Sequence, residues 1–385
     1  MKPRFEVADV LNAHWKALAS SGKYNSWQLR TLDALRRCRT ASMGGHIDAC
    51  TDCGHLRISY NSCRNRHCPK CQTVQRERWI EAREKELLPV SYFHVVFTLP
   101  EELNRICMYA PDKIYPLIFN TAWSTMQSFA KDPKYLAADT GMISILHTWG
   151  QNLSLHPHIH CIVPGGGITK AGFWKSSKTK GKFLFPVKAM SKVFRARFVA
   201  GIRSLFPMED QKLYDKLFSK QWVVYAKRPF LGPKQVIEYL GRYTHKVAIS
   251  NHRLLNIDDH SVTFRYKDYR NNSLSKEMII SNEEFIRRFS MHILPKRLVR
   301  IRHYGILSSS RKKKELPKIH TVLNSCYKEP EKKDWKAVSK ERLGYNPDLC
   351  PCCKKETMST IEQFDRRGPP YHLLSKVKPI QSTTC

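Results

Sequence analysis

Three histidines alternate along one short stretch of the chain. His156, His158 and His160 stand in SLHPHIHCIVPGGG, residues 154–167, on an apolar run with β-branched residues that ends at Pro-Gly-Gly-Gly. Period-two alternation is typical of a strand, so the three imidazoles are expected on one face. Two imidazoles two residues apart can bind one divalent cation. Histidines that are merely hydrogen-bonded are the alternative, and three in register favour a metal site.

Two tyrosines about eighty residues further on have the spacing of one helical face. Tyr239 and Tyr243 lie in GPKQVIEYLGRYTH, residues 232–245, where Gly-Pro precedes apolar residues at helical intervals. Two tyrosines at this spacing are, in isolation, usually a packing feature. A phenol attacks phosphorus poorly unless a cation offsets the charge on the phosphate oxygens. Together with the histidine strand, the pair predicts nucleophiles for phosphoryl transfer.

The catalytic cation predicted here is Mg²⁺ or Mn²⁺, bound by two imidazoles of this strand with positions left open for substrate. A third ligand is required, and the sequence leaves the choice open. If residues 149–154 form the turn of a hairpin, His147 falls opposite His156 on the histidine side of the strands. The alternative ligands are His156, His147, Gln151 and Glu238.

A cysteine-rich block near the N-terminus has the spacing of a zinc ribbon. Cys50 and Cys53 form one Cys-x-x-Cys pair, Cys68 and Cys71 form another, and fourteen residues lie between the two pairs. We expect these four thiolates to bind one structural Zn²⁺; disulfides are disfavoured because nothing in the sequence indicates export. A second metal or another ligand choice stays open because further candidates lie in or beside the block, namely Cys38, His46, His55, Cys63 and His67.

A smaller cysteine group, CPCC at residues 350–353, is half of a zinc knuckle. The sequence offers no obvious second pair for it. Its nearby partners would be Cys326, His320 or His372, and its role stays open.

The charge of the chain favours a polyanionic partner. Lys and Arg number 66 against 33 acidic residues, a formal net charge of +33 that recurs in most segments, which predicts DNA binding. Arg64 and Arg66 lie among the cysteines, and Arg300 and Arg302 share a face if their segment is extended, so all four are expected on DNA phosphates. The first 19 residues have scattered charges and no run approaches 18 apolar residues, so we expect neither a signal peptide nor a membrane span, and a cytoplasmic location.

The pattern of apolar runs and caps predicts strands mixed with helices, an α+β or α/β fold. We expect helices at 5–20, 26–37, 72–88, 101–131 (broken near 110–112), 191–206 and 282–289. Strands are expected at 92–98, 142–148, 155–163, 183–187, 222–226, 262–266 and 277–281. Residues 308–314, SSSRKKK, read as a flexible basic loop. Three regions are predicted: residues 1–90 helical and zinc-binding, 91–308 catalytic, and 309–385 a basic linker with a cysteine-containing tail.

In these features the sequence resembles the two-tyrosine HUH transposases of rolling-circle insertion sequences, of the insertion-sequence-91 type. The resemblance is carried, in the same order and over nearly the whole chain, by the cysteine block at 38–71, HVVFTLPEELN (94–104), HTWGQNLSLHPHIHCIVPGGG (147–167), YLGRY (239–243) and PKRLVRIRHYGILS (295–308). It implies an α+β fold with an RRM-like antiparallel sheet flanked by helices and preceded by a small zinc-binding domain. It also implies that His158 and His160 are the metal-binding pair, and that the protein nicks and rejoins single-stranded DNA through a 5′-phosphotyrosine, acting at the nucleoid.

Other classes remain to be separated from this one. HPHIHCIV also resembles the histidine-triad motif of nucleotide hydrolases and transferases, which would leave the tyrosines, cysteines and charge unexplained. A plasmid or phage replication initiator or relaxase would share the same chemistry, and a zinc-dependent DNA-binding protein would share the charge without catalysis. The order of attack by the tyrosines, the DNA sequence and the oligomeric state are not readable from the sequence.

Overall fold

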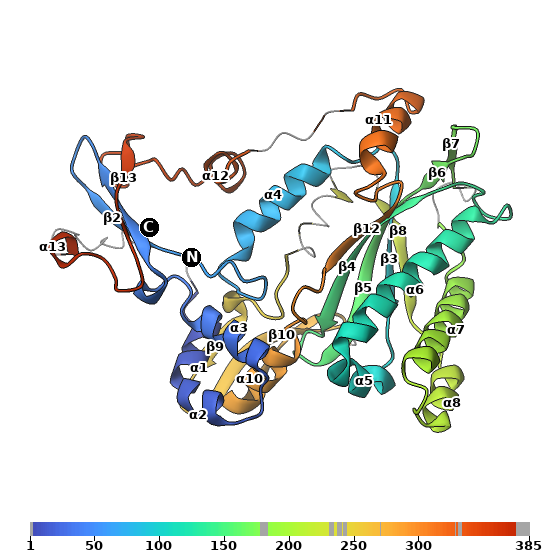
Figure 1. The fold of residues 1–385 in the computed structure, drawn as a ribbon, viewed down its shortest axis with the longest axis horizontal. Helices are drawn as coiled ribbons and strands as arrows, with labels where there is room; N and C mark the ends of the chain where they lie inside the picture. Colours follow the sequence, from blue (N-terminus) through green and yellow to red (C-terminus); the bar gives the residue numbers. More distant parts are fainter. Residues whose placement is uncertain are drawn as a thin grey trace.

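A five-stranded antiparallel sheet forms the centre of the protein, seen in a computed structural model (Figure 1). The structure describes residues 3–177, 184–230, 235–236, 241, 245–269, 271–327, 329 and 333–374. The strand order is β12-β4-β5-β3-β8, with β3 at Tyr92–Thr98, β4 at Gly141–Trp149, β5 at Leu155–Pro164, β8 at Val224–Phe230 and β12 at Ile301–Gly305. The fold class is therefore α+β, as the sequence predicted.

One face of this sheet is covered by helices, as Figure 1 shows for α6 and α7. Apolar residues recur every fourth position on α6, at Ile114, Ile118, Ala122 and Met126, and this stripe packs on the sheet in the largest core. Pro111 stands in the first turn of α6, where its missing N–H leaves no bond unmade. The helices of this layer are α5 (Asn104–Tyr109), α6 (Pro111–Lys131), α7 (Val187–Leu205) and α8 (Gln211–Ser219).

The opposite face of the sheet, here called the histidine face, carries the alternate residues of β3, β4 and β5. Ile143, Ile145 and Ile162 form a core there with residues of α4 (Gln72–Glu84) and α11 (Lys312–Val322). The histidines at alternate positions of the same strands belong to this face because side chains alternate along a strand. Directly after the end of β5, β6 (Gly166–Ile168) and β7 (Trp174–Ser176) form a small hairpin.

The N-terminal helices share a core with a segment that lies more than 200 residues away in sequence. Apolar side chains of α1 and α3 pack against Val262, Phe264 and Phe285. Asn25 caps α3, since its side chain accepts from the N–H of Gln28 at 2.9 Å. The elements here are α1 (Val7–Ala13), α2 (Trp15–Ser20), α3 (Ser26–Arg36), β9 (Leu254–Ile257), β10 (Ser261–Asp268), β11 (Leu274–Ser281) and α10 (Asn282–Met291).

A third sheet joins the two ends of the chain. Its order is β13-β1-β2, with β1 at Gly45–Cys50, β2 at Leu56–Tyr60 and β13 at Met358–Phe364. The helix α12 (Trp335–Leu343) precedes β13 and contacts α4, where Arg342 pairs with Glu77 and Glu84. A short α13 (Tyr371–Leu374) follows, and 3-10 turns occur at Ala41–Met43, Glu101–Leu103 and Asn251–Arg253. Contacts thus cross all the region boundaries expected from the sequence.

The structure differs from the expected elements at three segments. Residues 184–186 are irregular and α7 already begins at Val187, because Pro186 serves as its N-cap while Leu184 and Phe185 are buried in the core. The expected loop at 308–314 ends in the first turn of α11, where Lys312 pairs with Glu86 at 2.6 Å. The expected helix 5–20 is broken at His14. Within the described residues, no helix is long and apolar enough to span a membrane.

Candidate functional site: a histidine face and two cysteine clusters

The hairpin of β4 and β5 brings four histidines to one end of the histidine face. In its register His147 pairs with His158 and Ile145 pairs with His160. We expected His147 opposite His156, two residues away, and this was wrong. A bulge between His147 and Trp149 shifts the register, and the turn is closed by a bond from the N–H of Gly150 to the carbonyl of Ser154 at 2.9 Å.

Three of these imidazoles converge as a ligand set. One ring nitrogen each of His147, His158 and His160 lies within 4.8 Å of the others. Small ring rotations bring such nitrogens to the separation of about 4.2 Å or less that one cation requires. His147 and His160 are buried and His158 is half-buried, so the set has one accessible side. The structure thus brings His147 together with His158 and His160, the predicted pair of ligands.

His156 and Gln151 lie outside the converging set. The side chain of His156 is exposed, but its carbonyl lies 2.6 Å from Nδ1 of His158. If Nδ1 of His158 donates to that carbonyl, Nε2 carries the lone pair that a metal requires. Gln151 in the hairpin turn instead contacts the Tyr269 hydroxyl at 3.3 Å. Glu238 falls outside the described residues.

The sequence interpretation missed one histidine of the site, His94 on β3. Its Nε2 lies 2.9 Å from Nδ1 of His160, and the two rings stack with centroids 5.1 Å apart. When His160 offers Nε2 to a cation, its Nδ1–H donates to His94, an arrangement that orients the ligand ring. The sequence does carry a signal for this residue, since His94 interrupts the otherwise apolar strand YFHVVFT. A polar side chain buried in such a strand requires a hydrogen-bond partner.

Burial favours the neutral, metal-binding form of two of these imidazoles, those of His158 and His160. It lowers the pKa of His158 to about 4 and that of His160 well below its ordinary value. Two cationic side chains, Lys246 and Arg300, lie close enough to depress the pKa of His160 further. Positive charge therefore surrounds the histidines on a face where a phosphate would be attracted.

Tyr239 and Tyr243 lie outside the described residues, but residues on either side of them are placed. Gln235, Val236 and Gly241 have helical backbone. Val236 is buried in the histidine-face core beside Ile80 of α4, and a Cβ on Gly241 would come within 2.6 Å of that same Ile80. Beyond the tyrosines, the guanidinium of Arg300 donates to the carbonyl of Lys246 at 2.6 Å. Both flanks are therefore held on the histidine face.

The cysteines form two clusters, and the expected set of Cys50, Cys53, Cys68 and Cys71 is wrong as a grouping. The first cluster joins Cys68 and Cys71 to two other thiols, from the end of α3 and the loop after β2: it comprises Cys38, Cys63, Cys68 and Cys71. Cys50 and Cys53 lie at the turn of the β1–β2 hairpin, whereas this cluster lies at its base. Five residues of strand separate the two by about 17 Å, too far for one ion.

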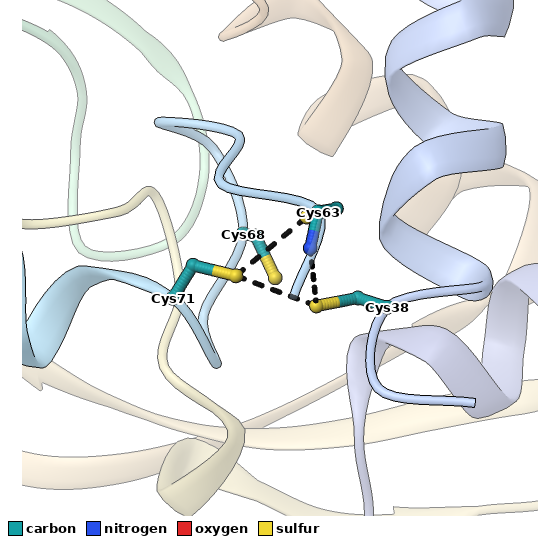
Figure 2. A group of neighbouring side chains, drawn as sticks. All are labelled: Cys38, Cys63, Cys68 and Cys71. Carbon is teal, nitrogen blue, oxygen red and sulfur yellow. Dashed lines mark hydrogen bonds between the residues drawn. The ribbon is translucent and has the colours of Figure 1, made fainter. Parts of the chain in front are cut away.

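The four sulfurs of the first cluster are turned toward a common centre, as Figure 2 shows. Sγ of Cys71 lies 3.3 Å from Sγ of Cys38 and 3.6 Å from that of Cys63, close to the edge of about 3.8 Å in a tetrahedron with Zn–S bonds of about 2.3 Å. Hydrogen bonds with neighbouring cysteines lower the pKa of Cys38 to about 7. The donor set therefore fits a structural Zn²⁺.

The second cluster comprises Cys50, Cys53, Cys350 and Cys353, with the latter pair supplied by the C-terminal segment. The group at residues 350–353 thus meets the N-terminal hairpin. Its expected partners Cys326, His320 and His372 are not in the cluster, and Nδ1 of His320 contacts the hydroxyl of Ser325 at 2.8 Å instead.

The four arginines expected on DNA phosphates differ in what they contact. The guanidinium of Arg66 donates to the carbonyls of Pro295 and Leu298, and that of Arg300 is buried over the ring of Trp149 at 5.2 Å. Arg302 lies over the ring of Phe119, so Arg300 and Arg302 form no common patch. Arg64, which directly follows Cys63, is exposed.

Comparison with known proteins agrees with this arrangement. Residues 141–315 match the family model of a putative transposase, and residues 10–99 match that of a transposase zinc-binding domain. The chain is 41% identical to putative transposase y4qJ of Sinorhizobium fredii over 95% of this chain and 97% of the relative. It is 26% identical to the transposase for insertion sequence element IS801 of Pseudomonas savastanoi pv. phaseolicola, over 89% of this chain and 85% of the relative. No solved structure matches. The chain belongs to the transposases of the insertion-sequence-91 type, and its N-terminal region is their zinc-binding domain.

Proposed function

We propose that this transposase nicks and rejoins single-stranded DNA at the ends of its element by tyrosine transesterification. The observation that carries the proposal is the convergence of three imidazoles on the sheet face against which both described flanks of the tyrosine segment pack. The nucleophiles are Tyr239 and Tyr243, four residues apart in the sequence, the spacing at which two side chains of a helix share a face. The reaction supports rolling-circle-like transposition, and we place it in the cytoplasm, at the nucleoid.

The donor set of the histidine face fits a divalent cation. Imidazoles are softer ligands than the oxygens that Mg²⁺ prefers, so His147, His158 and His160 favour Mn²⁺ over Mg²⁺. A bound cation would polarise the scissile phosphate. His94 and the carbonyl of His156 hold the rings of His160 and His158 in the orientation that leaves Nε2 available.

The reaction is reversible because the nucleophile is a tyrosine and not water. A tyrosine oxygen forms a bond to phosphorus, the bond from phosphorus to the 3′ oxygen breaks, and the phenolic proton is balanced by the proton that the freed 3′ hydroxyl gains. The 5′-phosphotyrosine retains a phosphodiester, so a 3′ hydroxyl of the same or another strand can displace the tyrosine. Two tyrosines can hold two strand ends in turn, which results in strand transfer.

The remaining regions bind DNA around this centre. The first cysteine cluster holds a structural Zn²⁺ and orders the loop that exposes Arg64 to phosphates. Lys246 lies at the end of the tyrosine segment, where its charge acts on the histidines and on a phosphate bound there.

The test is adduct formation with labelled single-stranded DNA from the element ends, with Mn²⁺, Mg²⁺ or EDTA, analysed on a denaturing gel. We expect a cation-dependent covalent adduct that maps to Tyr239 or Tyr243, and its loss in the Tyr239→Phe, Tyr243→Phe double variant with DNA binding retained. An undiminished adduct in the double variant would refute the tyrosine assignment. Binding without any adduct would identify a zinc-dependent DNA-binding protein instead, and action only on a plasmid origin would identify a replication initiator or relaxase.

A further inference from the structure

The turn at Cys50–Cys53 and the turn at Cys350–Cys353 have the same backbone geometry, although they lie 300 residues apart. In the first, the N–H of Cys50 donates to the carbonyl of His55 at 2.9 Å, and that of Gly54 donates to the carbonyl of Cys50 at 3.0 Å. In the second, the N–H of Cys350 donates to the carbonyl of Lys355 at 2.8 Å, and that of Lys354 donates to the carbonyl of Cys350 at 3.1 Å. Two matched turns facing each other form the framework of a four-thiolate site.

The residue after the second cysteine of each turn has left-handed backbone. Gly54 has φ +71° and Lys354 has φ +62°. Glycine adopts this region freely, whereas a lysine there is disfavoured by about 1–2 kcal/mol. The C-terminal segment therefore keeps the geometry of the turn at a residue that does not favour it, which indicates that interactions of the turn impose it.

The four sulfurs lie at distances suited to one ion and unsuited to disulfides. Sγ of Cys50 is 3.6 Å from that of Cys353, and Sγ of Cys53 is 3.6 Å from that of Cys350. A disulfide requires about 2.05 Å, whereas a tetrahedral zinc site has sulfurs about 3.8 Å apart. The Thr357 hydroxyl lies 3.1 Å from Sγ of Cys50, where it can donate to a thiolate.

Other contacts hold the two turns face to face. β13 pairs with β1 from Gly45–Phe364 to Cys50–Met358, which places the C-terminal turn beside the N-terminal one. The guanidinium of Arg57 donates to the carbonyl of Pro347 at 2.6 Å. The hydroxyl of Thr360 donates to Asp48, which also pairs with Arg57. The second pair of thiols is therefore delivered by a specific strand pairing.

We propose that Cys50, Cys53, Cys350 and Cys353 bind a second structural Zn²⁺ that fastens the C-terminal segment to the zinc-binding domain. Four thiolates in a closed tetrahedral set are the donor set of structural zinc. The matched transposase zinc-binding domain spans residues 10–99 and so contains only half of these ligands. This part of the N-terminal region is complete only when the C-terminal segment is present.

The small size of the surrounding core explains why a metal is required here. The buried apolar side chains at this cluster are those of Cys50, Cys350 and Met358, with Cys353 partly buried. So little apolar burial around the two turns gains little from the hydrophobic effect, and small cores of this kind are commonly stabilised by metals. The ion also links two turns that lie about 300 residues apart in the sequence. Without it, only the contacts around the β1–β13 pairing would keep these turns together.

The experiment counts thiolate-bound zinc in the full-length chain. An organomercurial that reacts with thiols displaces only zinc held by cysteine, so zinc at the histidine face is not counted. We expect two zinc ions per chain in the unmodified protein and one in the Cys350→Ser, Cys353→Ser double variant. Cys352, exposed and outside both clusters, provides the matched control, and Cys352→Ser should retain two. Two zinc ions in the double variant would overturn the proposal, and iron in place of zinc would overturn the metal assignment.

A second measurement uses the unmodified chain and so does not depend on a variant that folds. Alkylation mapped by mass spectrometry should leave Cys350 and Cys353 protected in the native protein and modify them once zinc is removed. Cys326 and Cys352 are exposed and should react in both states. Equal reactivity of Cys350 and Cys353 with and without zinc would overturn the proposal.

Discussion

The histidine face and the cysteine clusters differ in how completely they surround an ion. Each cysteine cluster supplies four thiols from segments that lie apart in the sequence. The histidine face supplies three imidazoles, one of them half-buried, beside cationic side chains. A closed set of four ligands is typical of structural zinc, whereas three ligands leave a position for substrate. The same chain thus holds two donor sets that suit a stabilising ion and one that suits chemistry.

The largest effect expected is on catalysis, from the histidine face. His160→Ala should reduce adduct formation at least about a thousandfold, because it removes several kcal/mol of charge stabilisation at about 1.4 kcal/mol per factor of ten. Single-turnover nicking measures it. Thiolate-bound zinc and the unfolding temperature serve as controls, and both should stay close to those of the unmodified protein. Nicking at the normal rate would show that the imidazoles do not hold the cation.

Breaking the first cysteine cluster should instead affect stability. Cys68 is buried in the core shared by the N-terminal helices and β10, so Cys68→Ser should remove one zinc and lower the free energy of unfolding by several kcal/mol. Chemical denaturation combined with zinc analysis measures both. Cys107→Ser provides the matched control, since Cys107 is equally buried in another core and should cost about 1–3 kcal/mol without loss of zinc. Full zinc content in Cys68→Ser would remove Cys68 from the ligand set.

Acid should weaken the hairpin that carries the histidines. Burial lowers the pKa of His292 to about 4, and its ring contacts Thr148 at 3.2 Å and the carbonyl of Leu153 at 3.1 Å. The folded pKa lies below the ordinary value of about 6.5, so this stabilisation is complete above pH 6.5 and is lost as the pH falls toward 4, by up to about 3 kcal/mol. His292→Gln should therefore lose less stability than the unmodified protein between pH 7.5 and pH 5, measured by urea unfolding. An identical loss in both would exclude His292 as a source of the acid sensitivity.

A subtler change tests how His94 acts on the site. His94→Ala should weaken the apparent Mn²⁺ affinity about 10- to 100-fold, because Nδ1–H of His160 loses its acceptor, while the rate at saturating Mn²⁺ changes little. His94→Gln retains an acceptor and should recover part of the affinity. A fall in the saturated rate with unchanged Mn²⁺ dependence would contradict a positioning role. Titration of Mn²⁺ in the nicking assay separates the two outcomes.

The smallest effect expected compares the two turns of the second cysteine cluster. Lys354→Gly should strengthen retention of the second zinc by about 0.5–1 kcal/mol, because glycine adopts positive φ freely and Lys354 is exposed. Gly54→Ala, at the matched position, should weaken retention by about 1 kcal/mol. Chelator competition measures both. The same sign of change in both variants would show that the backbone conformation does not determine retention.

Local patterns in the sequence were sufficient for much of the fold. Strict alternation in SLHPHIHCIV predicted β5 and the common face of its histidines, and the Asn25 cap predicted the start of α3. These features depend on interactions within a few residues, which the sequence states directly. The strand at 183–187 failed because Pro186 begins a helix, so a short apolar run alone did not distinguish a strand from a buried helix entry.

What the sequence by itself determined is the types and spacing of the candidate residues: histidines at alternate strand positions, cysteines in Cys-x-x-Cys pairs, and two tyrosines four residues apart. Only the tertiary structure decided which of them meet. A bulge placed His147 opposite His158, the length of the β1–β2 hairpin separated Cys50 from Cys68, and the pairing of β13 with β1 brought Cys350 to Cys50. Spacing along the chain fixes the direction of a side chain within its own element, whereas the meeting of distant ligands depends on register and on packing between elements.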